Sequence, residues 1–357
     1  MFTKSYLASK LSDFIFLNIN KDALASLFRK LPQGDIYMPM KASKIIGDVK
    51  TSGNIDKIDM KDLIEGMFFV IGCDEKFNYS KNYMDMLKDN EFSSKLVKGI
   101  IAKNINENNE ANAYLLLRGL YIIEPSEDVY DKLLYCLAII SESNKDLESE
   151  KDGIINVGKE FSYKLAYLYE SKNNYDKSNY IEAWDNLNLY FSYGGKSDES
   201  IEEFRNDLNI LSKLQEAKGI LIENPKHALE LLVPLLDECS DNATIPLYIA
   251  MACRNLGLYE KAIYYLNEAK NIDNEIIEIY NEFGLNFACL GDFPVAINYF
   301  KKSFEVTKSI EICTNIIMCY LNMGDNRSAK LHLKIAEKLD PEDDVVSKLK
   351  NILREAE

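Results

Sequence analysis

Apolar side chains recur three or four positions apart through much of the second half of the chain. Ile249, Cys253 and Leu256 follow this spacing, which returns 34 residues later at Phe283 and Phe287. An α-helix brings residues three and four apart onto one face, whereas a strand alternates at every second residue. The pattern therefore predicts amphipathic helices in this region.

A glycine follows each of these apolar segments at a nearly constant interval. Gly257, Gly291 and Gly324 are separated by 34 and 33 residues. Small residues follow each glycine after five and twelve positions, with a bulky apolar residue between them. The small residues are Ala262, Ala269, Ala296, Ser303, Ala329 and Ala336, and the bulky ones are Leu266, Phe300 and Leu333. Because glycine readily ends a helix and small residues seven apart let helices approach closely, we predict a repeated helix-turn-helix unit.

Residues 243–341 resemble three tandem tetratricopeptide repeats, a family of helical hairpins of ~34 residues that stack into a superhelix. Two positions depart from the pattern in the third unit: Asn326 stands where the others have Tyr259 and Phe293, and Ile317 stands where they have Ala250 and Gly284. The resemblance implies an all-α fold, a right-handed superhelical stack of helical hairpins, with a less regular N-terminal segment.

Upstream of residue 241 the repeat pattern is degenerate, and we interpret residues 61–240 as less regular helical hairpins. Residues 198–222 keep an apolar stripe with Gly219 as the one helix breaker, which predicts a single long helix. A new helix is expected at Pro225, because proline suits the first turn, and Pro234 is expected to end or kink it. The polar, charged run 141–153 predicts an exposed loop or a frayed helix end.

The first 60 residues do not fit the repeat, and we treat them as an N-terminal cap or small subdomain. The prolines in LPQGDIYMPMK favour extended or irregular backbone, and GDVKTSGNID has the composition of a loop. Asp59 is placed to cap the helix that follows. The predicted division is therefore 1–60, 61–240 and 241–357, the last ending in a polar capping helix.

Charge and hydropathy restrict the classes of partner. The formal net charge is −15, which repels nucleic-acid phosphates and anionic membrane surfaces alike. The longest apolar run, Leu133 to Ile140, is far shorter than the ~20 residues that span a bilayer. We expect a cytoplasmic protein that binds neither nucleic acid nor membrane. An uncapped repeat end can pair with a second copy, so the sequence allows a homodimer.

Motifs for catalysis or metal binding are not evident. Seven cysteines occur without a CxxC pair, and His227 and His332 are the only histidines, which argues against a zinc site or a histidine-dependent triad. Residues 48–59 are spaced like a calcium loop, but Lys50 occupies a position that needs an oxygen ligand. The GGKS of residues 194–197 lacks the rest of a phosphate loop and is expected to be an interhelical turn. We therefore expect no catalytic residues, no metal and no cofactor.

The resemblance also implies where a ligand binds. In tetratricopeptide repeats the first helix of each hairpin lines the concave surface along which peptides lie. The corresponding candidates are Tyr248, Met251, Arg254, Asn255, Asn281, Glu282, Leu285, Asn315, Met318 and Asn322. Asparagine amides can bond to a peptide backbone, while Met and Leu supply adaptable apolar contacts. Leu247 and Glu311 stand where one subset of the family carries the lysines that clamp a C-terminal carboxylate.

Three functional hypotheses follow. The first is a non-enzymatic scaffold that binds a peptide or protein segment in the groove. The second is an intracellular regulator that senses a small signalling peptide. The third is an enzyme-associated subunit with its chemistry in the N-terminal part. A compact trihelical N-terminal unit with a basic face would favour regulation, and a pocket of convergent polar groups there would favour chemistry.

Overall fold

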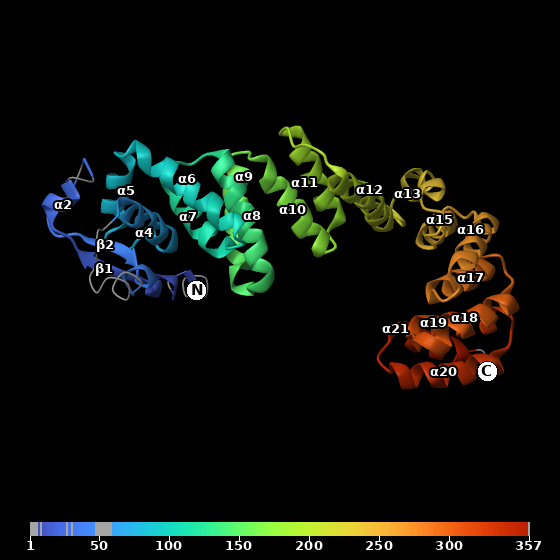
Figure 1. Cartoon of the computed structure of the whole chain (residues 1–357). Coiled ribbons are helices and arrows are strands. Elements are labelled where there is room, and N and C mark those ends of the chain that lie inside the picture. Colours follow the sequence, from blue (N-terminus) through green and yellow to red (C-terminus); the bar gives the residue numbers. More distant parts are fainter. Residues whose placement is uncertain (1–5, 8, 26–27, 30, 47–58, 356–357) are drawn as a thin grey trace. The chain divides into compact units, whose positions relative to one another are not determined.

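The computed structural model describes residues 6–7, 9–25, 28–29, 31–46 and 59–355 (Figure 1). Within these ranges helices dominate, which confirms the predicted all-α stack of helical hairpins with a less regular N-terminal segment. The chain forms two compact units: Met1–Asn173 with Asp185–Lys196, and Asn174–Trp184 with Ser197–Glu357. The calcium-like stretch predicted over 48–59 lies, apart from Asp59, outside the described residues.

The N-terminal segment contains a small antiparallel sheet. The 3₁₀ helix η1 (Lys10–Asp13) leads into β1 (Phe14–Asn18), and α2 (Lys21–Ala25) separates it from β2 (Tyr37–Lys41). The two strands pair with Phe14 opposite Lys41. The extended backbone predicted around the two prolines is thus confirmed at β2, whereas β1 was not predicted. Phe14 packs its ring 4.8 Å from that of Phe69 in α4 (Met60–Cys73), so the sheet shares a core with the helices that follow.

Helix α4 (Met60–Cys73) organises the first unit. Asp59 caps it as predicted, because its side chain accepts a hydrogen bond from the Lys61 N–H. The remaining helices of this region are α5 (Ser80–Lys88), α6 (Glu91–Asn106), α7 (Glu110–Ile123), α8 (Glu127–Ser143) and α9 (Glu148–Glu160). Helices α4 and α7 cross at Gly72 and Gly119, where a Cβ on either glycine would collide with the backbone of the other helix. Absence of side chains at the crossing therefore sets the helix spacing.

The prediction of a loop or frayed end over 141–153 was wrong. Helix α8 continues to Ser143, the 3₁₀ helix η2 covers Lys145–Leu147, and α9 begins at Glu148. Asn144 is the single non-helical residue, and its side chain accepts the Asp146 N–H to start the next turn. Leu147 is fully buried, so one apolar anchor within a polar run holds this segment in regular structure.

Helices α10 (Lys164–Asp176) and α11 (Tyr180–Ser192) precede the long helix predicted over 198–222, which is confirmed as α12 (Glu199–Ile220). The GGKS segment is the turn between α11 and α12, as expected, and Asp198 caps α12 by accepting the Ile201 N–H. Helix α13 (Pro225–Leu232) starts at Pro225, and α14 (Leu235–Glu238) follows Pro234. Both proline predictions are confirmed.

Three regular hairpins follow: α15 (Thr244–Asn255) with α16 (Tyr259–Ile272), α17 (Ile277–Cys289) with α18 (Phe293–Thr307), and α19 (Ile310–Asn322) with α20 (Asn326–Leu339). Gly257, Gly291 and Gly324 have φ angles of 76°, 83° and 75°, which confirms the left-handed turn predicted at each. Helix α21 (Asp344–Glu355) packs against the last hairpin and caps it.

The two departures in the third repeat leave its hairpin intact. Asn326 still opens α20, because Asp325 caps the helix by accepting the Ser328 N–H. Ile317 is fully buried in one cluster with Leu333, whereas Gly284 lies directly under the larger ring of Phe300. The first two repeats exchange volume between their helices, Ala250 with Leu266 and Gly284 with Phe300, whereas the third accommodates the larger Ile317 opposite a Leu of the same size as in the first.

Candidate functional site

The predicted ligand face lies on the first helices of the three regular hairpins, α15, α17 and α19. Met318 exposes 44% of its surface, and Asn255 and Asn322 are also exposed. Glu282 is buried, and the remaining candidates, Tyr248, Met251, Arg254, Asn281, Leu285 and Asn315, are half-buried. Part of the predicted set is therefore occupied by packing within the protein.

Arg254 and Glu282 form an ion pair that joins α15 to α17. The Arg254 Nε lies 2.8 Å from Glu282 Oε2, and its Nη2 lies 3.3 Å from Oε1. Burial raises the pKa of Glu282, while the hydrogen bonds and charge of Arg254 oppose that rise. Because each charge is satisfied by the other, this pair fixes the spacing of the first helices.

The asparagines on this face divide into two kinds. Asn255 donates from Nδ2 to the Leu221 carbonyl oxygen at 2.8 Å, and Asn322 donates to the Met318 carbonyl oxygen at 2.8 Å. By contrast, the Asn281 Oδ1 is buried and has no hydrogen-bond partner among the described residues. An unsatisfied buried acceptor is costly, so Asn281 is the amide on this face that most needs an external donor.

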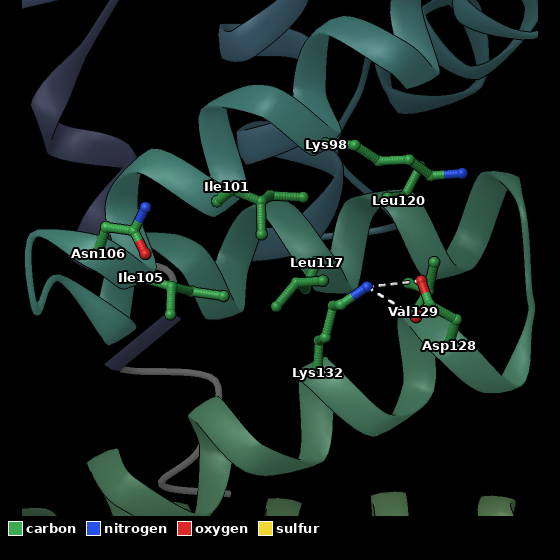
Figure 2. Close-up of a pocket in the computed structure, with 10 residues that line it drawn as sticks. Lys98, Ile101, Ile105, Asn106, Leu117, Leu120, Asp128, Val129 and Lys132 are labelled. Atoms are coloured by element: carbon green, nitrogen blue, oxygen red, sulfur yellow. Dashed lines mark hydrogen bonds and ion pairs between the residues drawn. The ribbon is translucent and has the colours of Figure 1, made fainter.

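A second candidate site, which the sequence did not predict, lies in the first unit between α6 and α8, with α7 as its floor. It is a pocket of about 230 Å³ (Figure 2). Its lining is Lys98, Ile101, Ala102, Ile105, Asn106, Leu117, Leu120, Asp128, Val129 and Lys132. Six of these ten residues are apolar, so the pocket offers a hydrophobic floor with polar groups at its edge.

Helix geometry explains how the pocket forms. Lys98, Ile101, Ala102 and Ile105 are spaced three, one and three apart, which places them on one face of α6. Leu117 and Leu120 of α7 are buried beneath, and α8 closes the other side with Val129. The same spacing is typical of ordinary core packing, so the sequence alone could not distinguish an open pocket from a filled one.

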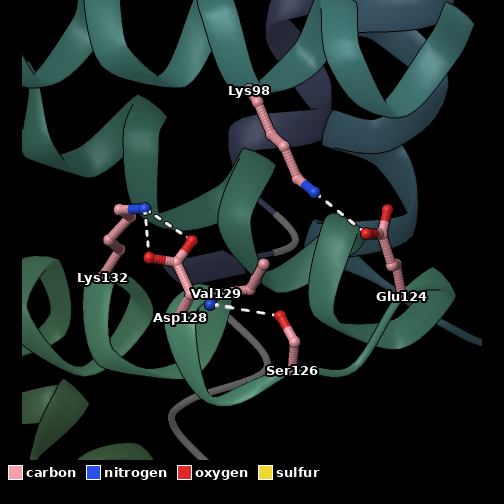
Figure 3. A network of polar contacts seen from close by, with 6 residues as sticks. All are labelled: Lys98, Glu124, Ser126, Asp128, Val129 and Lys132. Carbon is pink, nitrogen blue, oxygen red and sulfur yellow. Dashed lines mark hydrogen bonds and ion pairs between the residues drawn. The ribbon is translucent and has the colours of Figure 1, made fainter.

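Two ion pairs mark the rim of the pocket (Figure 3). Lys98 Nζ lies 2.9 Å from Glu124 Oε1, and Lys132 Nζ donates to the Asp128 carboxylate at 2.7 and 2.6 Å. The hydrogen bond from Lys98 lowers the pKa of Glu124. Both pairs are largely exposed, with side-chain exposures from 46% to 73%. Exposed pairs contribute little stability, so these charges can exchange partners when a ligand arrives.

A polar pocket of about 280 Å³ lies between the N-terminal segment and α4, lined by Lys41, Ser43, Lys44, Asp62 and Glu65. Its lysines are paired, Lys41 with Glu65 and Lys44 Nζ with Asp62 Oδ2 at 3.8 Å. The described part of the segment combines short helices with a two-stranded sheet packed on α4 and differs from the trihelical unit that would favour a regulator. The polar groups of this pocket converge, but each lysine is neutralised by a carboxylate.

Metal binding finds no support in the described residues, and two of the buried thiols are unreactive. These residues hold no group of three or more His, Cys, Asp or Glu side chains placed to bind a metal ion. The helices within the same ranges include none that is long and apolar enough to cross a membrane. Burial raises the pKa of the Cys73 and Cys136 thiols to about 12, so both remain protonated at neutral pH and act as small apolar side chains.

Comparison with known proteins identifies no family for this chain. No family model and no curated protein matches it. The chain is similar to a crystal structure of MamA protein, with 18% identity over 49% of this chain and 90% of that one and a TM-score of 0.37. A thermophilic TPR protein of Thermus thermophilus, TTC0263, gives 18% identity over 53% and 98% and a TM-score of 0.35. The APC/C hetero-tetramer Cut9-Hcn1 gives 13% identity over 82% and 63% and a TM-score of 0.42.

Proposed function

We propose that this chain is a non-enzymatic protein-interaction scaffold of the cytoplasm, which binds a peptide segment of a partner on the faces of its first helices. The observation that carries the proposal is the pocket between α6 and α8, a site whose apolar floor is formed by residues from three helices. A volume of about 230 Å³ suits one or two apolar side chains and is smaller than the ~300–1,000 Å³ of typical cofactor pockets.

The edge of the pocket supports a peptide in preference to a purely apolar ligand. The exposed ammonium of Lys98, the carboxylate of Asp128 and the amide of Asn106 lie around the apolar floor. A peptide backbone carries both donors and acceptors, so it can bond to groups of each kind while an apolar side chain fills the centre. The binding energy then comes from apolar burial, and the polar groups set orientation.

The regular hairpins provide a second part of the same proposal. Asn281, Asn315 and Met318 lie on first helices, and the buried Asn281 Oδ1 lacks a donor among the residues that the structure describes. Once the Asn281 side chain turns outward, an extended peptide along this face would supply that donor from its backbone N–H. We therefore retain the ten sequence-predicted residues as candidate ligand contacts, with Arg254 and Glu282 acting through the helix spacing that they fix.

An affinity capture from lysate of the cells that make this protein tests both parts. Ala102→Glu places a carboxylate in the pocket, and the control Lys103→Glu places it on the next, exposed position of α6 outside the pocket lining. A third variant combines Asn281→Ala, Asn315→Ala and Met318→Glu. We expect a partner that is retained by wild type and Lys103→Glu and lost by Ala102→Glu, by the triple variant or by both. A partner set unchanged by both would overturn the proposal.

A further inference from the structure

The outer face of α20 carries an apolar stripe that its counterparts lack. Leu331, Ile335 and Leu339 are spaced four apart and expose 56%, 40% and 41% of their surface. Their neighbours Ala329, Leu333 and Ala336 are buried on the opposite side of the same helix. Helix α20 is therefore apolar on two faces, and one of them faces solvent.

The other two repeats show what this face normally carries. The positions seven, eleven and fifteen residues after the turn glycine are Tyr264, Glu268 and Ile272 in α16 and Asn298, Lys302 and Val306 in α18. Each of these helices places a charged side chain in the middle of the face, whereas α20 has Ile335 there. Because the hairpins share one architecture, packing within the repeat does not require an apolar residue at this position. An exposed apolar stripe without a structural need is typical of an interaction surface.

The charge beside the stripe indicates the chemistry of the partner. Helix α20 has four basic residues, Arg327, Lys330, Lys334 and Lys338, and one acidic residue, Glu337, in a chain of net charge −15. The Glu337 carboxylate lies 2.7 Å from Lys350 Nζ of α21 and is thus already neutralised. Arg327, Lys334 and Lys338 are exposed, and on a helix with ~100° per residue they lie along one edge of the stripe. The face is thus apolar with a cationic flank.

We propose that this face of α20 is a docking site for an acidic amphipathic helix of a partner protein, whose apolar residues pack on Leu331, Ile335 and Leu339. Helices pack through stripes of this spacing, and Asp or Glu beside the partner's stripe would pair with Lys334 and Lys338. The proposal concerns a surface on a second helix of a hairpin and goes beyond ligand binding on the first helices.

A second copy of this chain is a poorer occupant on electrostatic grounds. Two α20 helices in the antiparallel arrangement of a two-fold dimer would bring their lysine flanks together, and two chains of charge −15 repel each other. The overall negative charge likewise opposes docking on an anionic lipid surface. An acidic helix is favoured locally by the lysines and apolar stripe, and salt dependence of binding follows from the same charges.

The test uses two synthetic helical probes of about three heptads, each with Leu at the core positions and flanked by Glu in one and by Lys in the other. Binding of each fluorescently labelled probe to the full chain is measured by anisotropy at low and high salt. We expect the Glu probe to bind at least about tenfold more tightly than the Lys probe, a difference that shrinks as salt increases. Leu331→Asp with Ile335→Asp should weaken binding at least about tenfold, and Lys334→Glu with Lys338→Glu should reverse the preference between probes.

Tyr264→Asp, at the equivalent exposed position of α16, is the matched control and should bind the Glu probe as wild type does. Far-UV circular dichroism checks that each variant keeps its helices. Failure of the Glu probe to bind saturably, equal binding of both probes, or equal loss in Tyr264→Asp would overturn the proposal. So would self-association abolished by Leu331→Asp, or lysine-dependent binding to phosphatidylserine vesicles without binding of the Glu probe, because these outcomes assign the face to a second copy or to lipid.

Discussion

Helices approach each other closely both in α4–α9 of the first unit and in the three regular hairpins of the second. The two regions achieve this approach by different means. In the hairpins, small residues at fixed intervals on the second helix let the pair approach, and Gly257, Gly291 and Gly324 lie in the turns. In the first unit, Gly72 and Gly119 lie inside α4 and α7, where backbone meets backbone at a single crossing. The small residues at fixed intervals recur in every hairpin, whereas the glycine crossing brings together one pair of helices.

The two regions also differ in how a helix is joined to the next helix but one. Arg254 and Glu282 join α15 to α17 directly. At the pocket, one rim ion pair joins Lys98 of α6 to Glu124, which follows α7, and the other joins Lys132 to Asp128 within α8. An apolar pocket lies between α6 and α8 (Figure 2). An ion pair thus bridges α15 and α17, whereas no rim pair of the pocket bridges α6 and α8.

The largest expected effect comes from Gly119→Ala. The added Cβ would collide with the Phe68 carbonyl, and backbone on both helices must move to accept it. We expect a loss of about 3 kcal/mol or more in the free energy of unfolding, measured by urea titration with far-UV circular dichroism. Gly99→Ala in α6 is the control, because its Cβ meets open space and alanine favours a helix by about 1 kcal/mol. Equal effects of the two changes would contradict the crossing.

The next effect tests the link between first helices. Arg254→Leu leaves the Glu282 carboxylate buried without its partner, and we expect a loss of about 3 kcal/mol near neutral pH. The pKa of Glu282 is already raised by burial, so the folded state binds protons more readily and the loss should shrink as the pH falls toward the range in which carboxylates titrate. Arg254→Leu with Glu282→Leu should recover most of the stability. A pH-independent loss would show that the pair is not the cause.

A smaller effect tests volume exchange between repeats. Gly284→Ala should cost about 1–2 kcal/mol, because the new Cβ meets the ring of Phe300. Adding Phe300→Leu makes the second repeat resemble the first, which has Ala250 and Leu266 at these positions. The double variant should therefore lose at least about 1 kcal/mol less than the sum of the single changes. Thermal and urea unfolding of the four proteins provide the cycle, and strict additivity would refute the exchange.

The smallest effect concerns Asp131, a partly buried carboxylate of the first unit. The Asp131 Oδ1 is buried without a hydrogen-bond partner among the described residues, and burial raises the pKa of this side chain to about 6. A raised carboxylate pKa means that the folded state binds more protons, so its contribution to stability falls as the pH rises from about 4 to about 6. Asp131→Asn should be more stable than wild type by about 1 kcal/mol above this window and equally stable below it. An advantage that persists below the window would point to another cause.

The regular hairpins were predictable because their signal occurs three times. Gly257 alone is compatible with many turns, but its recurrence at Gly291 and Gly324 identifies the unit and places both helices. The long helix α12 and the start of α13 at Pro225 were equally predictable, since both depend on local chemistry. The hairpin architecture could thus be predicted from nearby residues.

The remaining features depend on contacts between distant residues. Strand β1 forms because Phe14 meets Phe69 and the backbone of β2, which the local sequence does not indicate. Gly72 and Gly119 look like weak points in helices until the crossing is seen. The set of residues predicted for the ligand face includes one held inside the protein, because Glu282 looks exposed by position and is buried beside Arg254. The α6–α8 pocket was missed because its apolar residues have the spacing of core residues.

Site-specific photo-crosslinking tests the scaffold proposal most directly. A photoreactive phenylalanine analogue is placed at Ala102, an exposed residue of the pocket lining, and separately at Lys103 outside it. After irradiation in the cells that make the protein, mass spectrometry identifies the attached segments. We expect a discrete partner peptide with an apolar residue attached at Ala102 and absent at Lys103. The same products from both positions, or none at Ala102, would contradict a ligand in this pocket.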